Sequence, residues 1–267
     1  MKISRSIVIG IRSISNFFKN HWLIYKYRVG ISPNNENVEQ LAHVLIVKNL
    51  AYVEISTFSI LSFLFYNKKS KVVIHCDEIC FEKIQEKYSI QITMGRVELK
   101  KDMSDSDWQL SKLKIFKDLA SEAHCMFDVD TRWNGKLELE SSVSYVSHFE
   151  FPFIEKSPWR WLIMSYLKLD DGEKFVMLNT SFIRKSDLIR DSDSFLDEIF
   201  ESLFNISDCT EIGRGDLPGV IRIAEQVAIS IYLQHKNLTV KALVGDGRPR
   251  SGMLLETTYF GATGNKF

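Results

Sequence analysis

The stretch His124–Asp130, HCMFDVD, runs from apolar residues into two aspartates, Asp128 and Asp130, with one valine between them. The apolar residues that precede Asp128 predict a short buried strand. In an extended chain, residues i and i+2 point the same way and lie about 6.5 to 7 Å apart. Two carboxylates placed so close together repel each other unless a cation lies nearby. The stretch therefore predicts a site for a hard divalent cation at the end of a strand; the alternative is a turn capped by two aspartates.

Strands and helices alternate on both sides of this stretch. The apolar patterns predict strands at 43–48, 70–77, 90–94, 143–151 and 174–183, and helices at 56–67, 78–89, about 107–122, 158–169, 194–204 and about 219–235. Buried strands separated by single helices imply right-handed crossovers and parallel pairing. The expected fold class is α/β, with a mixed, mostly parallel central sheet flanked by helices. Ligands then bind at the carboxyl ends of the strands.

Asp-x-Asp by itself is weak support for a metal site, because the triplet occurs three times in this chain. Asp105 and Asp107 come just before a predicted helix, and so do Asp191 and Asp193. Both of these pairs are expected to cap helix N-termini, where carboxylates accept hydrogen bonds from free backbone N–H groups. Only Asp128 and Asp130 follow a predicted buried strand.

The composition fits one globular domain over residues 36–267, preceded by a basic arm over residues 1–35. The whole chain has 267 residues, with 34 basic and 34 acidic residues. This charge balance gives no field that favours nucleic acid as a partner. The cysteines (Cys76, Cys80, Cys125 and Cys209) are too few and too scattered for a disulfide framework, which fits a cytoplasmic location. Buried thiols are expected rather than a metal site at Cys76 and Cys80.

The basic arm has the pattern of an amphipathic helix. Apolar residues recur every three or four positions from Ile3 to Trp22, and the arm carries six basic residues and no acidic ones, hence a charge of +6. Such a helix either lies peripherally on an anionic membrane surface, through residues 1–30 at the inner membrane face, or packs on the catalytic domain or on a second copy in a homo-oligomer. The chain has no apolar run of about 18 residues that would span a bilayer.

The order of these motifs resembles glycosyltransferases of the GT-A fold, a Rossmann-related architecture, over roughly residues 43–267. The glycogenin and bacterial galactosyltransferase-like group is the most similar. In this family an apolar strand ends in Asp-x-Asp, which binds manganese together with a nucleotide-sugar. The resemblance implies that Asp128 and Asp130 are the metal ligands, that Mn²⁺ or Mg²⁺ is the cofactor, and that a nucleoside-diphosphate sugar is the donor.

The same resemblance assigns residues to the nucleotide. The segment VKNLAYVE is similar to the family's nucleotide-contacting loop, so that Val47, Lys48, Asn49 and Tyr52 would face the donor, with the Tyr52 ring against the base. The family usually has aspartate at the position of Asn49, and core packing is the alternative role for Tyr52.

The helix WQLSKLKIFKDLA is similar to one that carries a basic residue toward the sugar and phosphates. Lys112 or Lys114 fills that role by resemblance, and Lys114 is the residue assigned to the donor. The alternative is that both are ordinary solvated lysines.

Three later segments supply the remaining candidates by resemblance. In FVMLNTSFI, Asn179 and Thr180 would meet the donor sugar, with Ser181 where the family has glycine. In AEQVAI, Gln226 would bind the donor, and Glu225 would orient a sugar hydroxyl or act as the base. At the C-terminus, Lys266 would meet the diphosphate.

Two points about this set stay open. The family's metal-binding histidine is absent near Lys266, so that water or Asn265 would replace it. Asp216, in a loop before the last predicted helix, is a second candidate base.

The expected function is that of a metal-dependent hexosyltransferase, retaining or inverting. It would move a sugar from a nucleotide-sugar to a hydroxyl of a glycan or lipid-linked glycan, as in cell-surface polysaccharide synthesis. The alternatives are a GT-A-like binding or scaffold protein that has lost its chemistry, and a nucleotidyltransferase. The latter would need a glycine-rich phosphate loop after the first strand, where VKNLAYVE has no glycine.

Overall fold

The strands form one large sheet and one small one. The computed structural model describes residues 21–33, 40–103, 108–119, 124–150, 177–186, 198, 224–235, 239–243 and 257–259. Within these ranges the strands are β1 (Gln40–Ile46), β2 (Ser70–Cys76), β3 (Val97–Lys100), β4 (His124–Phe127), β5 (Thr131–Trp133), β6 (Ser144–Glu150), β7 (Met177–Arg184), β8 (Val240–Ala242) and β9 (Thr257–Tyr259). A 7-stranded sheet has the order β3-β2-β1-β4-β7-β6-β8, and β5 pairs with β9.

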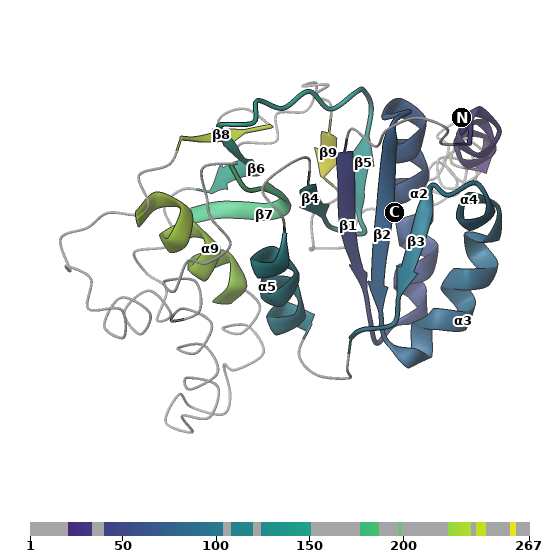
Figure 1. The fold of residues 1–267 in the computed structure, drawn as a ribbon, viewed down its shortest axis with the longest axis horizontal. Coiled ribbons are helices and arrows are strands. Elements are labelled where there is room, and N and C mark those ends of the chain that lie inside the picture. The colour runs from purple at the N-terminus through teal and green to yellow at the C-terminus, as the bar shows by residue number, and fades with distance from the viewer. Residues whose placement is uncertain are drawn as a thin grey trace, which may run out of the picture.

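The first half of the large sheet is parallel and the second half is mixed. β3, β2, β1 and β4 pair in parallel, β7 is antiparallel to both β4 and β6, and β6 and β8 are parallel. The carboxyl ends of β1, β2 and β4 therefore lie at one edge of the sheet (Figure 1). The expected fold class, a mixed and mostly parallel sheet flanked by helices, is confirmed.

Helices cover this sheet. They are α2 (Leu50–Tyr66), α3 (Glu78–Lys87), α4 (Ser89–Thr93), α5 (Trp108–Asp118) and α9 (Ala224–His235), and residues 21–30 are also helical. α2 runs behind β1 and β2 beside α3, whereas α5 and α9 contact each other and pack on β1 and β7, respectively (Figure 1). No helix among the described ranges is both long enough and apolar enough to cross a membrane.

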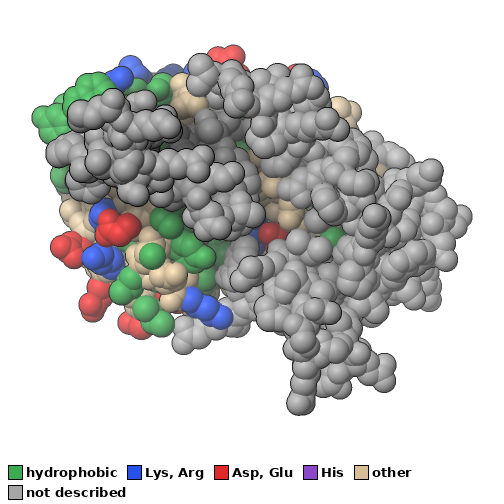
Figure 2. All heavy atoms as spheres, turned by 180° about the vertical axis from the view of Figure 1, so that it is seen from behind, with side chains coloured by type: hydrophobic (Ala, Val, Ile, Leu, Met, Phe, Trp, Pro, Cys, Tyr) green, Lys and Arg blue, Asp and Glu red, His purple; other side chains and the backbone are tan. Residues whose placement is uncertain are grey.

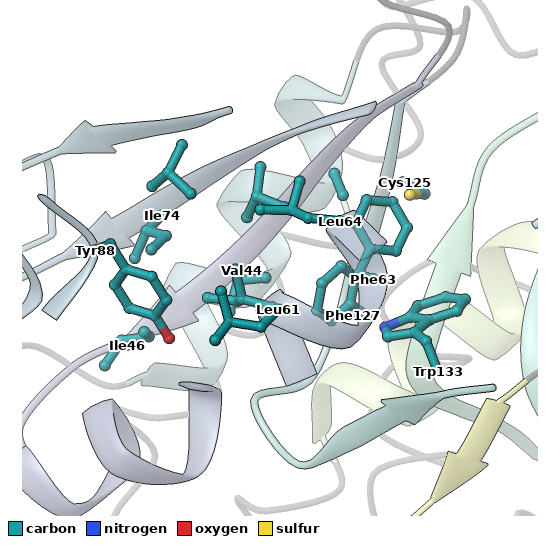
Figure 3. Close-up of a cluster of buried hydrophobic side chains, with 14 of the residues drawn as sticks. Val44, Ile46, Leu61, Phe63, Leu64, Ile74, Tyr88, Cys125, Phe127 and Trp133 are labelled. Atoms are coloured by element: carbon teal, nitrogen blue, oxygen red, sulfur yellow. The ribbon is translucent and has the colours of Figure 1, made fainter. Parts of the chain in front are cut away.

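The core lies between the parallel strands and α2. Val44 and Ile74 on the strands and Leu61 and Phe63 on α2 are almost completely buried (Figure 3). α2 is apolar over most of its circumference, as expected for a helix that is covered on several sides. The buried cysteines Cys76, Cys80 and Cys125 are free thiols, as predicted, and Cys209 lies outside the described residues.

One predicted strand is wrong. Residues 90–93 belong to the short helix α4, Met94 is its C-cap, and the next strand, β3, begins only at Val97. Gly95 has a φ of +67°, the left-handed conformation that commonly ends a helix. The apolar alternation in IQITM is too short to distinguish a strand from one helical turn, whereas the glycine that follows it marks the helix end.

Most other predicted elements are confirmed with shifted ends. The first helix begins at Leu50, earlier than expected, because Asn49 is its N-cap and accepts a hydrogen bond from the Ala51 N–H. The helix predicted over about 219–235 is described as α9, from Ala224. The helices predicted at 158–169 and 194–204 lie outside the described residues, apart from Glu198.

Candidate active site

A tight turn carries the two aspartates. β4 ends at Phe127, Asp128 follows directly, and the Thr131 N–H donates to the Asp128 carbonyl at 3.0 Å. Phe127 before the turn and Trp133 after it pack edge to face, with ring centroids 5.2 Å apart (Figure 3). The Asp128 N–H also donates to the Ser181 carbonyl at 2.8 Å, which ties the turn to β7.

The expectation that Asp128 and Asp130 share an extended strand is wrong, because Asp130 lies in the turn. The chain must reverse here to enter β5, and the hydrogen bond to the Asp128 carbonyl closes that reversal. The two carboxylates still interact, since the charge of Asp128 raises the pKa of Asp130.

A buried lysine joins Asp128 to a second acidic residue. The Lys112 ammonium on α5 lies 2.9 Å from Asp128 Oδ1, 3.3 Å from Glu225 Oε1 and 3.3 Å from Thr180 Oγ1. Thr180 Oγ1 also lies 3.0 Å from Glu225 Oε2. The Lys112 side chain is 2% exposed and that of Glu225 is 4% exposed, whereas that of Asp128 is 29% exposed. Three elements, α5, β7 and α9, thus converge on the residue that follows β4.

The charges of this cluster stabilise one another. Burial alone would lower the pKa of Lys112, but Asp128 and Glu225 together raise it above its ordinary value. Burial raises the pKa of Glu225, which Lys112 partly offsets. Glu225 also lies in the first turn of α9, where the helix dipole favours a negative charge. Lys112 therefore holds two carboxylates in a region from which water is mostly excluded.

Among the described side chains, no cation is paired with Asp130 as Lys112 is with Asp128. Burial and the charge of Asp128 raise the pKa of Asp130 to about 7, and Lys112 lowers it only in part. When Asp128, Asp130 and Glu225 are all ionised, these three negative charges and the positive charge of Lys112 give the described cluster a net charge of −2. This excess, presented by carboxylate oxygens, fits a hard divalent cation at Asp128 and Asp130.

Of the two candidate lysines, Lys112 lies in this cluster and Lys114 does not. Lys114 is exposed on α5, and Lys112 is the lysine that contacts Asp128. The signal was present in the sequence, because Lys112 is spaced by three, four and seven residues from Ile115, Phe116 and Leu119. Those three residues are buried, so Lys112 lies on the apolar face of the helix.

The predicted nucleotide-facing residues lie at the carboxyl end of β1. Val47 is buried, whereas Tyr52 is 44% exposed on the first turn of α2, so that Tyr52 does not pack in the core. Asn49 uses its side-chain oxygen to cap α2. Lys48 has a φ of 64°, a left-handed conformation that is uncommon for a residue other than glycine.

A buried aspartate that sequence reasoning missed fixes this loop. Asp77 is 1% exposed and accepts hydrogen bonds from the Lys48 N–H and from the Cys80 N–H at 2.9 Å. It is the N-cap of α3, at the carboxyl end of β2. Its place directly before a predicted helix was the available signal. Asp77 thus holds the loop after β1 against the end of β2.

The remaining candidates are only partly described. Asn179 and Thr180 are buried within β7, and Asn179 accepts a hydrogen bond from the Ser181 N–H at 3.0 Å. Gln226 is half-buried on α9. Asp216, Asn265 and Lys266 lie outside the described residues. Within those residues, no group of three His, Cys, Asp or Glu side chains is arranged to hold a metal ion.

Comparison with known proteins gives similarities to solved structures only. No protein-family model and no curated protein matches the chain. The apo-form glycosyltransferase GlyE of Streptococcus pneumoniae TIGR4 is similar with a TM-score of 0.46 and 12% identity, over 77% of this chain and 45% of GlyE. This chain thus corresponds to less than half the length of GlyE.

Two further similar structures contain sugar ligands. The galactosyltransferase LgtC, in complex with donor and acceptor sugar analogs, has a TM-score of 0.41 and 11% identity, over 72% of this chain and 70% of LgtC. The mannosyltransferase PcManGT from Pyrobaculum calidifontis, in complex with GDP-Man and Mn²⁺, has a TM-score of 0.33 and 10% identity, over 54% of this chain and 47% of PcManGT.

Proposed function

We propose that this protein is a metal-dependent glycosyltransferase that moves a sugar, of the hexose class, from a nucleoside-diphosphate sugar to a hydroxyl of a glycan or lipid-linked glycan. The observation that carries the proposal is the excess of negative charge on the turn after β4. The charge of Asp128 acts on Asp130 there, and Lys112 on α5 contacts Asp128 and is also paired with Glu225 on α9. The site lies at the carboxyl edge of the parallel strands, where α/β proteins bind their ligands.

The donor's diphosphate and a cation suit this site together. Asp128 and Asp130 would hold Mn²⁺ or Mg²⁺, with water, Asn265 or the diphosphate as further oxygen ligands. The bound cation would neutralise charge on the departing nucleoside diphosphate. The exposed Tyr52 ring and the loop that Asp77 holds would receive the nucleotide, and Lys266 would meet the diphosphate.

Lys112 and Glu225 act as positioning residues in this proposal. Lys112 holds Asp128 by a charge-assisted hydrogen bond and offsets part of the negative charge. Both oxygens of Glu225 are within hydrogen-bond distance of Thr180, and one is also paired with Lys112. A carboxylate so engaged is suited to orienting its neighbours, so the role of base in an inverting reaction would belong to Asp216.

A screen of nucleotide-sugars for Mn²⁺-dependent donor hydrolysis tests the proposal. The wild-type protein should hydrolyse one class of donor, and Asp130→Ala should lower the rate by about two orders of magnitude or more, because transition-state charge on the diphosphate loses its counter-ion. Glu138→Ala is the matched control, since the Glu138 side chain is 78% exposed. Unchanged hydrolysis and metal dependence in Asp130→Ala would contradict the assignment.

Thermal unfolding separates an enzyme from a scaffold protein. A ligand that binds only the folded state raises the melting temperature. Mn²⁺ with the matching nucleoside diphosphate should therefore raise the Tm of the wild-type protein. No shift with any common nucleoside diphosphate would favour the scaffold alternative.

A further inference from the structure

The helix at residues 21–30, called here the N-terminal helix, packs on α2 through one face. Tyr27 is 2% exposed and lies within 5.1 to 6.1 Å, between ring centroids, of Phe58, Phe65 and Tyr66. A Cβ added at Gly30 would come within 2.4 Å of the Phe65 ring, which shows how closely the two helices approach. Just beyond the helix, Arg96 donates to the Ser32 carbonyl at 2.8 Å.

The opposite face exposes three large apolar side chains. Trp22, Tyr25 and Val29 are 61%, 66% and 69% exposed, and their spacing of three and four residues places them on one stripe of the helix. These fractions exceed those of the other exposed large hydrophobic residues described, which range from 44% to 56%. A contiguous apolar stripe of this kind indicates an interaction surface.

The charge of this region indicates what kind of surface would meet it. Lys26 and Arg28 are exposed on the same helix, and the Lys26 ammonium lies 5.8 Å from the centre of the Trp22 ring. Residues 1–35 carry six basic residues and no acidic ones. The N-terminal helix lies at the upper right of Figure 1 and hence at the upper left of Figure 2, which is seen from behind. Hydrophobic and basic side chains gather at that corner of Figure 2.

We propose that the outer face of the N-terminal helix, formed by Trp22, Tyr25 and Val29, docks on an anionic lipid surface. Tryptophan and tyrosine prefer the boundary between headgroups and acyl chains, and lysine can extend its charged end toward lipid phosphates. A second copy of this chain is a poorer partner, because a two-fold contact through this face would bring Lys26 and Arg28 of one copy close to those of the other. The proposal does not depend on the proposed transferase function.

Co-sedimentation of the full-length chain with vesicles tests the proposal. The probes are vesicles of phosphatidylcholine alone and of phosphatidylcholine with phosphatidylglycerol at a ratio of about 3 to 1, at low and high salt. The protein should bind the mixed vesicles, and high salt should weaken this binding. The variant Trp22→Ser/Tyr25→Ser/Val29→Ser should bind the mixed vesicles more weakly than the wild type, by a factor of roughly ten or more.

Two further variants make the test specific. Ile79→Ser/Ile90→Ser removes other exposed apolar side chains, 54% and 56% exposed, and should bind like the wild type. Lys26→Glu/Arg28→Glu keeps the apolar stripe and should lose binding to anionic vesicles. Because this charge variant retains Tyr27 and the rings on which it packs, it keeps the test decisive should the triple serine variant unfold.

Three results would overturn the proposal. The first is equal sedimentation of the wild type with both kinds of vesicle, or none with either. The second is that a stably folded triple serine variant, or the charge-reversal variant, binds like the wild type. The third is a dimer in solution that the triple serine variant converts to a monomer without any binding to vesicles, which would make the face a contact between copies.

Discussion

At the scale of single residues, the site depends on a lysine that is buried without being neutralised. Lys112 is 2% exposed, yet Asp128 and Glu225 raise its pKa. A buried charge is tolerated only when its partners replace the hydration that it has lost. The sequence pointed to the Asp-x-Asp motif by its place after a predicted strand, and to Glu225 only by resemblance to the GT-A family. Their shared contact with Lys112 could not be predicted, because it depends on how α5 and α9 pack.

Lys112→Met should destabilise the protein strongly. The substitution leaves the buried Glu225 carboxylate without its cation, and removing one partner of a buried ion pair costs about 3 to 5 kcal/mol. Equilibrium unfolding in urea measures the change in the free energy of unfolding. Lys114→Met on the same helix removes an exposed lysine and should change it by about 0.5 kcal/mol or less. Equal effects of the two substitutions would contradict the cluster.

Asp130→Asn should stabilise the metal-free protein at alkaline pH. Burial and Asp128 raise the pKa of Asp130 from 3.8 to about 7, so the folded protein favours the protonated carboxyl. The stability that comes with this preference is fully present below pH 3.8 and is lost as the pH rises through 7. Asparagine cannot ionise. At pH 8 the free energy of unfolding of the variant should therefore exceed that of the wild type by on the order of 1 kcal/mol, after allowance for solvent screening of this half-buried group. Unfolding at pH 4 and pH 8 in a chelator measures this gain, and equal stabilities at pH 8 would contradict the pKa.

At the scale of elements, a row of histidines ties the parallel strands together. The central ring is that of His43 on β1, which is hydrogen bonded to His75 on β2 at 2.8 Å and to His124 on β4 at 3.1 Å. His75 is also paired with Asp102 at 2.8 Å. The rings are stacked, with centroids 5.2 and 5.3 Å apart. The sequence did not reveal this row, because the three positions meet only in the register of the folded sheet.

The histidine row should make the protein lose stability in acid. Burial, followed by His75, His124 and Lys100, lowers the pKa of His43 from 6.5 to about 3. Burial also lowers that of His75, although Asp102 and Asp118 oppose the effect. These histidines therefore bind protons more readily in the unfolded chain than in the folded one, and the free energy of unfolding falls as the pH drops from 6.5 toward 3.

Unfolding of His43→Gln between pH 4 and pH 7 tests this prediction. The free energy of unfolding should fall less steeply with decreasing pH in His43→Gln than in the wild-type protein. The exposed His21 offers the control, since His21→Gln should keep the wild-type slope. A wild-type slope in His43→Gln would show that the row does not govern acid stability.

At the scale of the whole molecule, the order of strands and helices was largely predictable and their arrangement was less so. Apolar runs separated by helical patterns gave the correct expectation for β1, β2 and α3, and for a parallel half of the sheet. The antiparallel β7 and the short strands β5, β8 and β9 depend on distant pairing, which local patterns do not encode. The fold brings α5 and α9 together over the end of β4, and the site exists only because of that arrangement.

The central claim is that Asp128 and Asp130 share a divalent cation with a nucleoside diphosphate. Electron paramagnetic resonance of free Mn²⁺ during titration with protein and UDP or GDP tests it directly. The wild-type protein with the matching diphosphate should remove one equivalent of Mn²⁺ from the free signal. The double variant Asp128→Asn/Asp130→Asn should remove no more than the diphosphate removes alone. Equal uptake of Mn²⁺ by the wild type and a folded double variant would contradict the account.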